Sequence, residues 1–436
     1  MDTPSMPSWT RGTTILLVAF LVAGFIAGIA VAAITPLTPS RTYATTLTNT
    51  QTTTVTKAYT TTLTQPSTVM RAHTTTLTLQ SVVVTQTITT SVPHIPLTFE
   101  VKYSRQFEIR LVDGYKIVRD ALNRTLILVP RGQQPPPGLN GVVVYTPVER
   151  VVLMSATQVA LVERLREHAP WILDRVVGIM WGGQYEWYFE EVAERLSQGV
   201  IRDVGPDYSP NFEEIVTLRP DLVIIYTFPG SDLPTRLEEL GIPYVVDNEY
   251  LETTSLGRFE WIKLIATFFN LDEEAYRIFS EVEGEVSRIV SDIKRAGLAQ
   301  PVACWFMVYR GVVYVAGGQS FPANTLAMLG ARYAFSDLES KGSVTINIEK
   351  LLSSCRDADV VVYPTSFISS VQDILSEAPE LGEIKAFREG RVYAYAPTIF
   401  QLGYYDTEGW IRDLAIILYP NLYPGQTTTY FIRLGG

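Results

Sequence analysis

The chain has 436 residues, 47% hydrophobic and 18% charged, and is therefore long enough for more than one hydrophobic core. A net charge of −10 and a pI near 5.0, with no basic block, argue against binding to nucleic acid. Of its three histidines, His73 and His94 lie in or beside a threonine-rich tract, so no histidine-based triad or zinc site forms at normal spacing. We expect no enzyme, no metal site and no cofactor.

The N-terminal segment predicts a membrane anchor. Thr13 to Ile34 contains no charged residue, and as a helix of about 22 residues it would span about 33 Å. Arg11 and the amino terminus favour a cytoplasmic N-terminus. We assign residues 1–35 to a cytoplasmic tip and a signal anchor. The alternative is cleavage, because Ala30-Val31-Ala32 is similar to a signal-peptidase site.

A threonine-rich tract follows at residues 36–100. It contains roughly 25 threonines among about 65 residues and too few apolar side chains to form a core. We interpret it as an O-glycosylated stalk that holds the rest of the chain outside the cell at a single-pass membrane anchor. The alternative is β structure, which threonine also favours.

Residues 101–150 are expected to form an entry hairpin and linker. Ile109 to Val112 and Leu126 to Val129 are short apolar runs, with a turn signal at Asp113-Gly114 after the first. Asn123-Arg124-Thr125 is the one Asn-x-Ser/Thr match, so Asn123 is a candidate for N-glycosylation.

The remainder predicts two α/β lobes with parallel central sheets, at residues 151–255 and 298–436. In the first lobe, apolar strands near 151–154, 175–180, 222–226 and 244–247 alternate with helices, which is typical of helical crossovers between parallel strands. Residues 256–297 read as one long helical region, interrupted near Asn270, that bridges the lobes. A second series has strands near 302–308, 312–316, 359–363 and 391–395.

The most informative stretch joins a short helix to a buried strand at residues 211–228. Its helix presents Ile215 and Leu218 on one face, Pro220 ends it, and Leu222 to Ile225 read as a strand covered on both faces. The segments Asn-Phe-Glu-Glu-Ile and Leu-Arg-Pro-Asp-Leu-Val-Ile resemble a segment of the substrate-binding proteins of ABC importers for iron-siderophores, haem and vitamin B12. Further short segments resemble the same family in the same order across residues 100–420, and the stalk looks like those of archaeal membrane-anchored receptors.

This resemblance implies that one long helix bridges the lobes and that the ligand binds between them in a largely preformed pocket. It also implies a metal-chelate cargo and, as partners, an ABC permease with its ATPase. In the family an exposed glutamate at the start of one helix in each lobe docks onto permease arginines, and Glu213 and Glu349 match those positions. The alternative is that both acids only favour their helix dipoles.

Aromatic residues are concentrated where strand ends are expected to open towards a ligand. Flat rings can stack on a corrin, porphyrin or catecholate, and arginine can pair with a carboxylate. The alternative is that most of these rings are core or rim packing. The predicted ligand-binding residues are Trp181, Tyr185, Trp187, Tyr188, Tyr309, Arg310, Gln319, Tyr404 and Tyr405.

Cys304 and Cys355 lie in the same half of the chain, and outside the cell a disulfide between them would persist. Two separate buried thiols are the alternative. For the whole protein, the alternative to a transport receptor is a surface adhesion or sensory module that reuses the fold. A hydrolase would need a nucleophile and base that the sequence does not offer.

Overall fold

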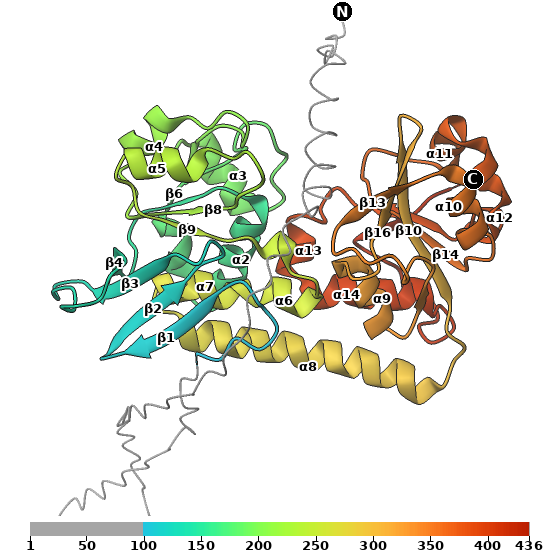
Figure 1. Cartoon of the computed structure of the whole chain (residues 1–436), viewed down its shortest axis with the longest axis horizontal. Helices are drawn as coiled ribbons and strands as arrows, with labels where there is room; N and C mark the ends of the chain where they lie inside the picture. Colours follow the sequence, from blue (N-terminus) through green and yellow to red (C-terminus); the bar gives the residue numbers. More distant parts are fainter. Residues whose placement is uncertain (1–98, 436) are drawn as a thin grey trace, which may run out of the picture. The chain divides into compact units, whose positions relative to one another are not determined.

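The N-terminal sheet precedes the two lobes. The computed structural model describes residues 99–435, and in it β1 (Glu108–Val112), β2 (Tyr115–Arg119), β3 (Thr125–Pro130) and β4 (Val142–Thr146) form a four-stranded sheet (Figure 1). The predicted turn at Asp113-Gly114 is present, with positive φ at both residues, but it joins β1 to β2 and not to the predicted run Leu126 to Val129. That run is β3, which pairs antiparallel with β2, and β4 pairs parallel with β3. The predicted anchor and stalk lie outside the described residues.

This sheet is fixed to the first lobe and not a loose linker. The Lys116 ammonium pairs with Asp272 at 2.5 Å, and the Val148 N–H donates to the Phe268 carbonyl at 2.9 Å. Leu126 and Leu128 of β3 are buried in the core that it shares with the lobe. Within residues 99–435 no helix combines the length and apolarity that a bilayer crossing requires.

The first lobe has the predicted parallel sheet. Its strand order is β7-β6-β5-β8-β9, all parallel. All four residues of β8 are fully buried, as the continuous apolar run indicates. The strands are β5 (Val151–Leu153), β6 (Val176–Ile179), β7 (Arg202–Asp203), β8 (Leu222–Ile225) and β9 (Tyr244–Val246). The helices are α2 (Ala156–Arg166), η1 (Pro170–Arg175), α3 (Glu190–Ser197), α4 (Phe212–Leu218) and α5 (Leu233–Glu239).

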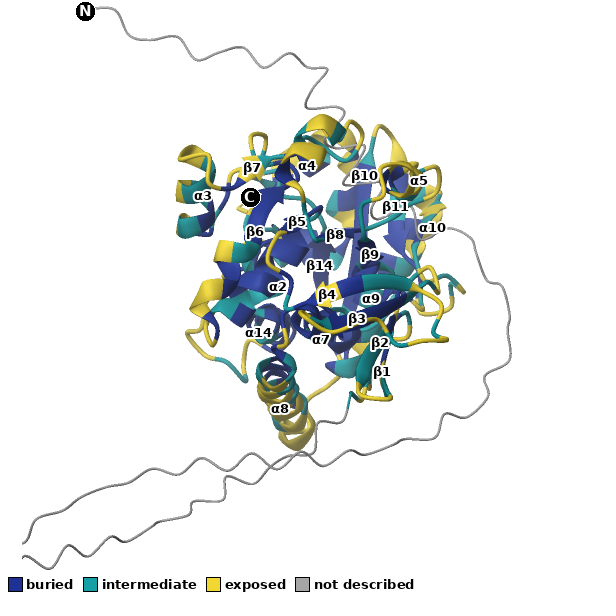
Figure 2. Ribbon diagram, turned by 90° about the vertical axis from the view of Figure 1, so that its left-hand side faces the viewer, coloured by how far each residue is buried: buried dark blue, intermediate teal, exposed yellow. Residues whose placement is uncertain are grey.

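The helical region between the lobes consists of several helices. After η2 (Glu249–Leu251) come α6 (Ser255–Phe259), α7 (Trp261–Phe268) and α8 (Asp272–Ala296). The break is where we expected it, because Asn270 has a left-handed φ of 58° that no helix tolerates. Only α8, of 25 residues, runs from one lobe to the other (Figure 1). One face of α8 is buried and the other exposed (Figure 2).

The sheet of the second lobe is mixed, so the prediction of a parallel sheet in this lobe was wrong. β10, β14 and β15 are parallel, whereas β11, β13 and β16 pair antiparallel, and β12 adds a short parallel pairing to β10. The reason is the turn at Arg310-Gly311, where φ of 52° and 74° sends the chain straight back along β10. The strands are β10 (Val302–Tyr309), β11 (Val312–Ala316), β12 (Arg332–Tyr333), β13 (Ser343–Ile346), β14 (Val360–Tyr363), β15 (Val392–Tyr395) and β16 (Phe431–Arg433).

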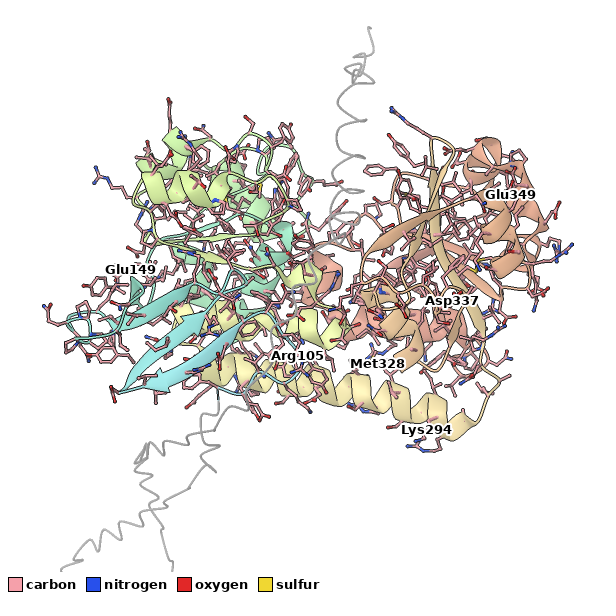
Figure 3. The ribbon with its side chains drawn as sticks, in the orientation of Figure 1. Arg105, Glu149, Lys294, Met328, Asp337 and Glu349 are labelled. Atoms are coloured by element: carbon pink, nitrogen blue, oxygen red, sulfur yellow. A yellow bond between two sulfur atoms is a disulfide. The ribbon has the colours of Figure 1, made fainter. Side chains whose placement is uncertain are left out.

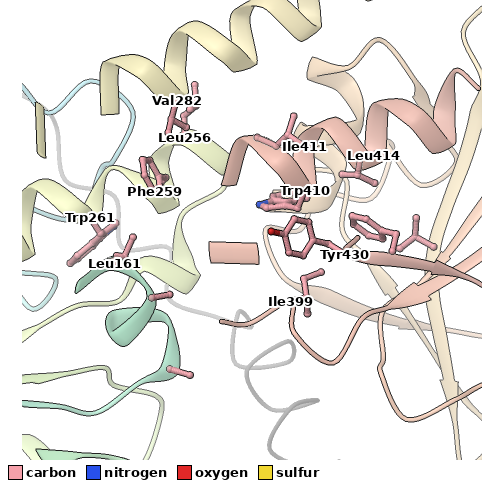
Figure 4. Close-up of a cluster of buried hydrophobic side chains, with 14 of the residues drawn as sticks. Leu161, Leu256, Phe259, Trp261, Val282, Ile399, Trp410, Ile411, Leu414 and Tyr430 are labelled. Carbon is pink, nitrogen blue, oxygen red and sulfur yellow. The ribbon is translucent and has the colours of Figure 1, made fainter. Parts of the chain in front are cut away.

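The helices of the second lobe include the segments that meet the first. They are α9 (Phe321–Met328), α10 (Ile348–Cys355), α11 (Val371–Glu377), η3 (Pro379–Glu383), α12 (Lys385–Arg388), α13 (Leu402–Tyr405) and α14 (Thr407–Leu418). One apolar core continues through both lobes. Phe259, Trp261 and Val282 on one side belong to the same buried cluster as Trp410 and Leu414 of α14 (Figure 4).

The two cysteines form a disulfide. Cys304 in β10 and Cys355 at the end of α10 are bonded, with their Cα atoms 6.1 Å apart, and both are fully buried. The bond therefore ties the last turn of α10 to the central sheet of the second lobe.

Replacing both cysteines by alanine should destabilise the second lobe. The bond closes a loop with a sequence separation of 51 residues, for which the chain-entropy relation gives about 4 kcal/mol of stabilisation. Guanidinium unfolding of the oxidised protein and of the Cys304→Ala/Cys355→Ala variant measures the difference. Equal unfolding midpoints would show that the bond contributes nothing to stability.

Candidate functional site

The loop after β6 places three of the predicted aromatic residues together. Trp181 is 6% exposed, and its ring stacks on that of Tyr185 with centroids 5.2 Å apart and an interplanar angle of 5°. The Tyr185 ring in turn lies 6.2 Å from the Trp187 ring. Burial, with a smaller contribution from the charge of Asp207, raises the pKa of Tyr185 to about 12. The three rings pack against one another, as the core-packing alternative also expects, and their ligand-binding role stays a prediction.

Trp181 has a strained backbone. Its φ of 62° lies in the left-handed region, which costs a residue with a side chain about 1 kcal/mol or more. The conformation is held by the Trp181 N–H, which donates to the Gly205 carbonyl at 3.1 Å. Such strain is common where a side chain is held in a functional position, and here it turns the indole towards Tyr185 and, edge-on, towards Tyr208.

Gly182 and Gly183 hold this loop close to β7. Their N–H groups donate to the two carboxylate oxygens of Asp203 at 3.0 Å each, and the Gly205 N–H adds a third bond at 3.0 Å. A Cβ on Gly182 would lie 3.0 Å from the Asp203 Cβ and 3.1 Å from its Cα, so the close approach of the two segments favours glycine there. Asp203 therefore has a positioning role for the loop.

Tyr188 meets the second lobe through a residue that we did not predict. The Tyr188 N–H donates to Gln401 Oε1 at 2.9 Å, and Gln401 Nε2 donates to the Glu186 carbonyl at 2.8 Å. Gln401 is 5% exposed and comes just before α13. The aromatic loop is thus fastened to the second lobe. No local sequence signal marks this glutamine, because its partners lie more than 200 positions earlier in the chain.

Tyr404 and Tyr405 lie at the same junction and are already engaged there. The Tyr404 hydroxyl accepts a hydrogen bond from Arg258 at 3.2 Å, and the Tyr405 hydroxyl donates to Glu167 at 2.5 Å. The nearby ion pair of Arg164 with Glu408, at 2.8 Å, also joins the lobes. Tyr405 therefore contributes to contact between the lobes, and the ligand-binding role of both tyrosines stays a prediction.

The other three predicted residues lie apart from this cluster. Tyr309 and Arg310 are at the tip of the β10–β11 hairpin, where the Arg310 guanidinium lies 5.3 Å from the Tyr309 ring centroid and is exposed. Gln319 is exposed, and its N–H donates to the Ser340 carbonyl at 2.9 Å. Within residues 99–435, no ring contact or hydrogen bond joins them to the aromatic loop. Their ligand-binding role stays a prediction.

A buried acidic pair lies beneath the junction. Asp247 is fully buried, and Glu249, 5% exposed, accepts a hydrogen bond from the Thr157 hydroxyl at 2.8 Å. Burial, and for Asp247 also the charge of Glu249, raises the pKa of both carboxyl groups. The Arg258 guanidinium opposes the shift of Glu249. No cluster of three or more His, Cys, Asp or Glu side chains in the described part of the chain has an arrangement suited to a metal ion.

A cavity of about 680 Å³ adjoins the aromatic loop. It lies between that loop and α3, and every residue that lines it belongs to the first lobe. The lining combines the aromatic rings of Tyr185 and Trp187 with Leu196, Ile201 and the polar Arg202 and Asp203. The expected ligand position between the lobes is therefore not where this cavity lies. The cavity shares Tyr185 and Trp187 with the aromatic loop.

The two predicted docking glutamates are exposed in the first turns of α4 and α10. Asn211 and Asn347 cap these helices, accepting hydrogen bonds from the Glu214 and Lys350 N–H groups at 3.0 and 2.8 Å. Among the described residues, the carboxylates of Glu213 and Glu349 make no ion pair, so both are available for a partner (Figure 3 labels Glu349). Asn123 is exposed in the turn after β2.

Comparison with known proteins identifies the family. The model of the family described as periplasmic binding protein matches residues 158–398, a little over half of the chain. The chain belongs to the periplasmic binding protein family. It is a substrate-binding protein of the ABC-transporter type and not an enzyme. The N-terminal sheet, β1 to β4, precedes the matched region.

Two relatives and one solved structure are similar to this chain. An uncharacterized lipoprotein of Methanocaldococcus jannaschii is 33% identical over 73% of this chain and 78% of its own length. A second uncharacterized lipoprotein of that organism is 24% identical over 75% of this chain and 84% of its own length. A periplasmic haem-binding protein from Pseudomonas aeruginosa has the same fold, with a TM-score of 0.51 at 18% identity over 66% of this chain and 99% of that one.

Replacing Gln401 by methionine should loosen the aromatic loop. The substitution keeps a similar volume but removes both hydrogen bonds to the loop backbone, at a cost of about 2 kcal/mol. We expect a lower urea midpoint and faster hydrogen exchange at the Tyr188 amide. The exposed Gln319→Met is the matched control, which should change neither. Unchanged exchange at Tyr188 in the Gln401 variant would show that the loop is held by other contacts.

Proposed function

We propose that this protein is an extracytoplasmic receptor that binds a metal chelate, such as an iron-siderophore, haem or cobalamin, and delivers it to an ABC permease. The observation that carries the proposal is the aromatic cluster of Trp181, Tyr185 and Trp187 beyond the carboxyl end of β6, in a chain of this family. Stacked rings provide flat apolar surface for a planar ligand. The haem-binding fold relative is consistent with that cargo class.

The receptor is proposed to be tethered to the outer face of the cell membrane. The apolar segment Thr13 to Ile34 and the threonine-rich tract provide an anchor and a spacer. The names of the lipoprotein relatives support a membrane-attached binding domain in this group.

A ligand titration tests the receptor function. The intrinsic tryptophan fluorescence should change on addition of one class among ferric siderophores, haem and cobalamin, because Trp181 and Trp187 lie within the proposed site. A ligand at 100 times its Kd should also stabilise the fold by about 2.7 kcal/mol. Mass spectrometry of co-purified material would identify the natural cargo. If neither fluorescence nor melting temperature responds to any of these chelates, chelate transport is the wrong function.

Docking to the permease is proposed to use Glu213 and Glu349. Each carboxylate is exposed, lacks an ion pair among the described residues, and lies on a helix held by an asparagine cap. The disulfide at the end of α10 holds the helix that carries Glu349. A charged pair at an interface costs about 2 to 5 kcal/mol when one partner is removed.

Replacing Glu213 and Glu349 by lysine should abolish transport while ligand affinity stays unchanged, because docking and ligand binding use different surfaces. Cargo uptake by cells and titration of the purified protein measure the two properties separately. Glu273→Lys is the matched control: Glu273 is also an exposed acid in the first turn of a helix, but on α8 (Figure 1). Normal uptake by the double variant would instead favour an adhesion or sensory module.

A further inference from the structure

One acidic side chain stands among the aromatic rings at the strand ends of the first lobe. Asp207 follows β7 and is half-buried. Its Oδ2 accepts a hydrogen bond from the Tyr226 hydroxyl at 2.8 Å. Its Oδ1 is buried and has no hydrogen-bond partner among residues 99–435. A buried carboxylate oxygen without a hydrogen-bond donor lowers the stability of the ligand-free protein, and a ligand that supplies a donor would remove this cost.

No cation within the described residues compensates Asp207. The one hydrogen bond of normal geometry to its carboxylate within residues 99–435 comes from the neutral Tyr226 hydroxyl, and the nearby backbone N–H groups of Tyr208 and Asp207, also neutral, leave Oδ1 without a bond. Desolvation outweighs them and raises the pKa of this carboxyl group. Asp203, four positions earlier, is different because three backbone N–H groups satisfy it. Asp203 therefore positions the loop, whereas Asp207 Oδ1 can still accept a hydrogen bond.

The surroundings of Asp207 favour a positive charge. The charge of Asp207 acts on the hydroxyl groups of both Tyr185 and Tyr226, so these side chains are its neighbours. Trp181 stacks on Tyr185, and Tyr226 meets Tyr250 edge-on with ring centroids 6.3 Å apart. Aromatic faces carry negative potential and attract cations, and an adjacent carboxylate adds to that attraction. The same arrangement disfavours an anionic group.

The position of Asp207 is suited to ligand contact. Trp181, Asp207 and Tyr226 follow the parallel strands β6, β7 and β8, so they lie beyond the same edge of the sheet. Asp207 is half-buried, and a rotation about its terminal torsion that turned Oδ1 towards an incoming group would exchange the Tyr226 hydrogen bond for a contact with that group.

We propose that Asp207 is a ligand-binding residue that receives a positively charged nitrogen of the solute, such as a protonated amine. The inference rests on the proposed receptor function and narrows it: the preferred chelate carries a cationic group, and strongly anionic chelates are poor ligands. Trp181 and Tyr185 pack against the part of the solute next to that group.

A pair of probes that differ in one charge tests this assignment. Ferrioxamine B carries a pendant amine that is protonated at neutral pH, and its N-acetyl derivative lacks that charge. Ferrioxamine B should bind at least about tenfold more tightly to the wild-type protein, the usual effect of one charge-assisted hydrogen bond. Asp207→Asn should weaken the binding of ferrioxamine B by about 10- to 100-fold. The variant should also bind ferrioxamine B and its N-acetyl derivative equally well.

The stability of the variant separates a binding role from a structural one. Asparagine keeps an acceptor for the Tyr226 hydroxyl but removes the buried charge. Because the pKa of Asp207 is raised in the folded chain, its ionised form opposes folding at neutral pH. Asp207→Asn should therefore unfold at the same or a higher denaturant concentration. Asp203→Asn, the matched control, should unfold at a lower one, because its amide would face backbone donors.

The outcomes distinguish this inference from the receptor function itself. If both probes bind equally to wild type, or Asp207→Asn leaves ferrioxamine B affinity unchanged or tightens it, the inference is wrong while the receptor function stands. A loss of stability in Asp207→Asn would assign the residue a structural role and also overturn the inference. If neither probe binds but another chelate in the titration does, the cationic preference is wrong. If no chelate binds, the receptor function fails as well.

Discussion

The apolar contact between the two lobes is the constraint on which the rest of the structure depends. Leu161 of the first lobe and Trp261 of α7, between the lobes, belong to one buried cluster with Trp410 and Leu414 of α14 (Figure 4). Burial of large side chains contributes about 1.5 to 3 kcal/mol each, so opening this contact would cost many times the thermal energy. The lobes therefore keep a fixed spacing.

Polar contacts between the lobes adjust the spacing that the apolar core sets. Gln401 fastens the aromatic loop to the second lobe, and the ion pair of Arg164 with Glu408 joins α2 to α14. Each such contact contributes little net stability, because its groups were hydrated in the unfolded chain. They are directional, however, and so they decide where the rings of the loop point.

The same region holds groups that oppose folding. Trp181 has a left-handed backbone, the acidic pair Asp247 and Glu249 is buried, and Asp207 has an oxygen without a donor. Local rules of structure are broken mostly where function requires it, and the large shared core supplies the stability that offsets them. This concentration of unfavourable features beside the aromatic cluster is an independent reason to place the site there.

Much of the fold could be predicted from local patterns. The buried β8, the helix α4 with its asparagine cap, the first hairpin and the break at Asn270 all follow from periodicity or from residues with strong backbone preferences. The mixed sheet of the second lobe could not, because an apolar run shows that a strand is buried but not whether its neighbour runs parallel or antiparallel. Short strands such as β12 and β16 carry too few residues for a pattern to emerge.

The sequence by itself determined the fold class, the order of the lobes, the family resemblance and the acids at the starts of α4 and α10, since each is encoded within a few neighbouring residues. Only the tertiary structure decided that Cys304 bonds to Cys355, that Tyr405 joins the lobes, that Gln401 holds the aromatic loop and that Asp207 Oδ1 lacks a donor. The physical reason is that periodicity records which side of an element is buried. Hydrogen-bond partners and charges at one point in space come from segments that are distant in the chain, and only packing brings them together.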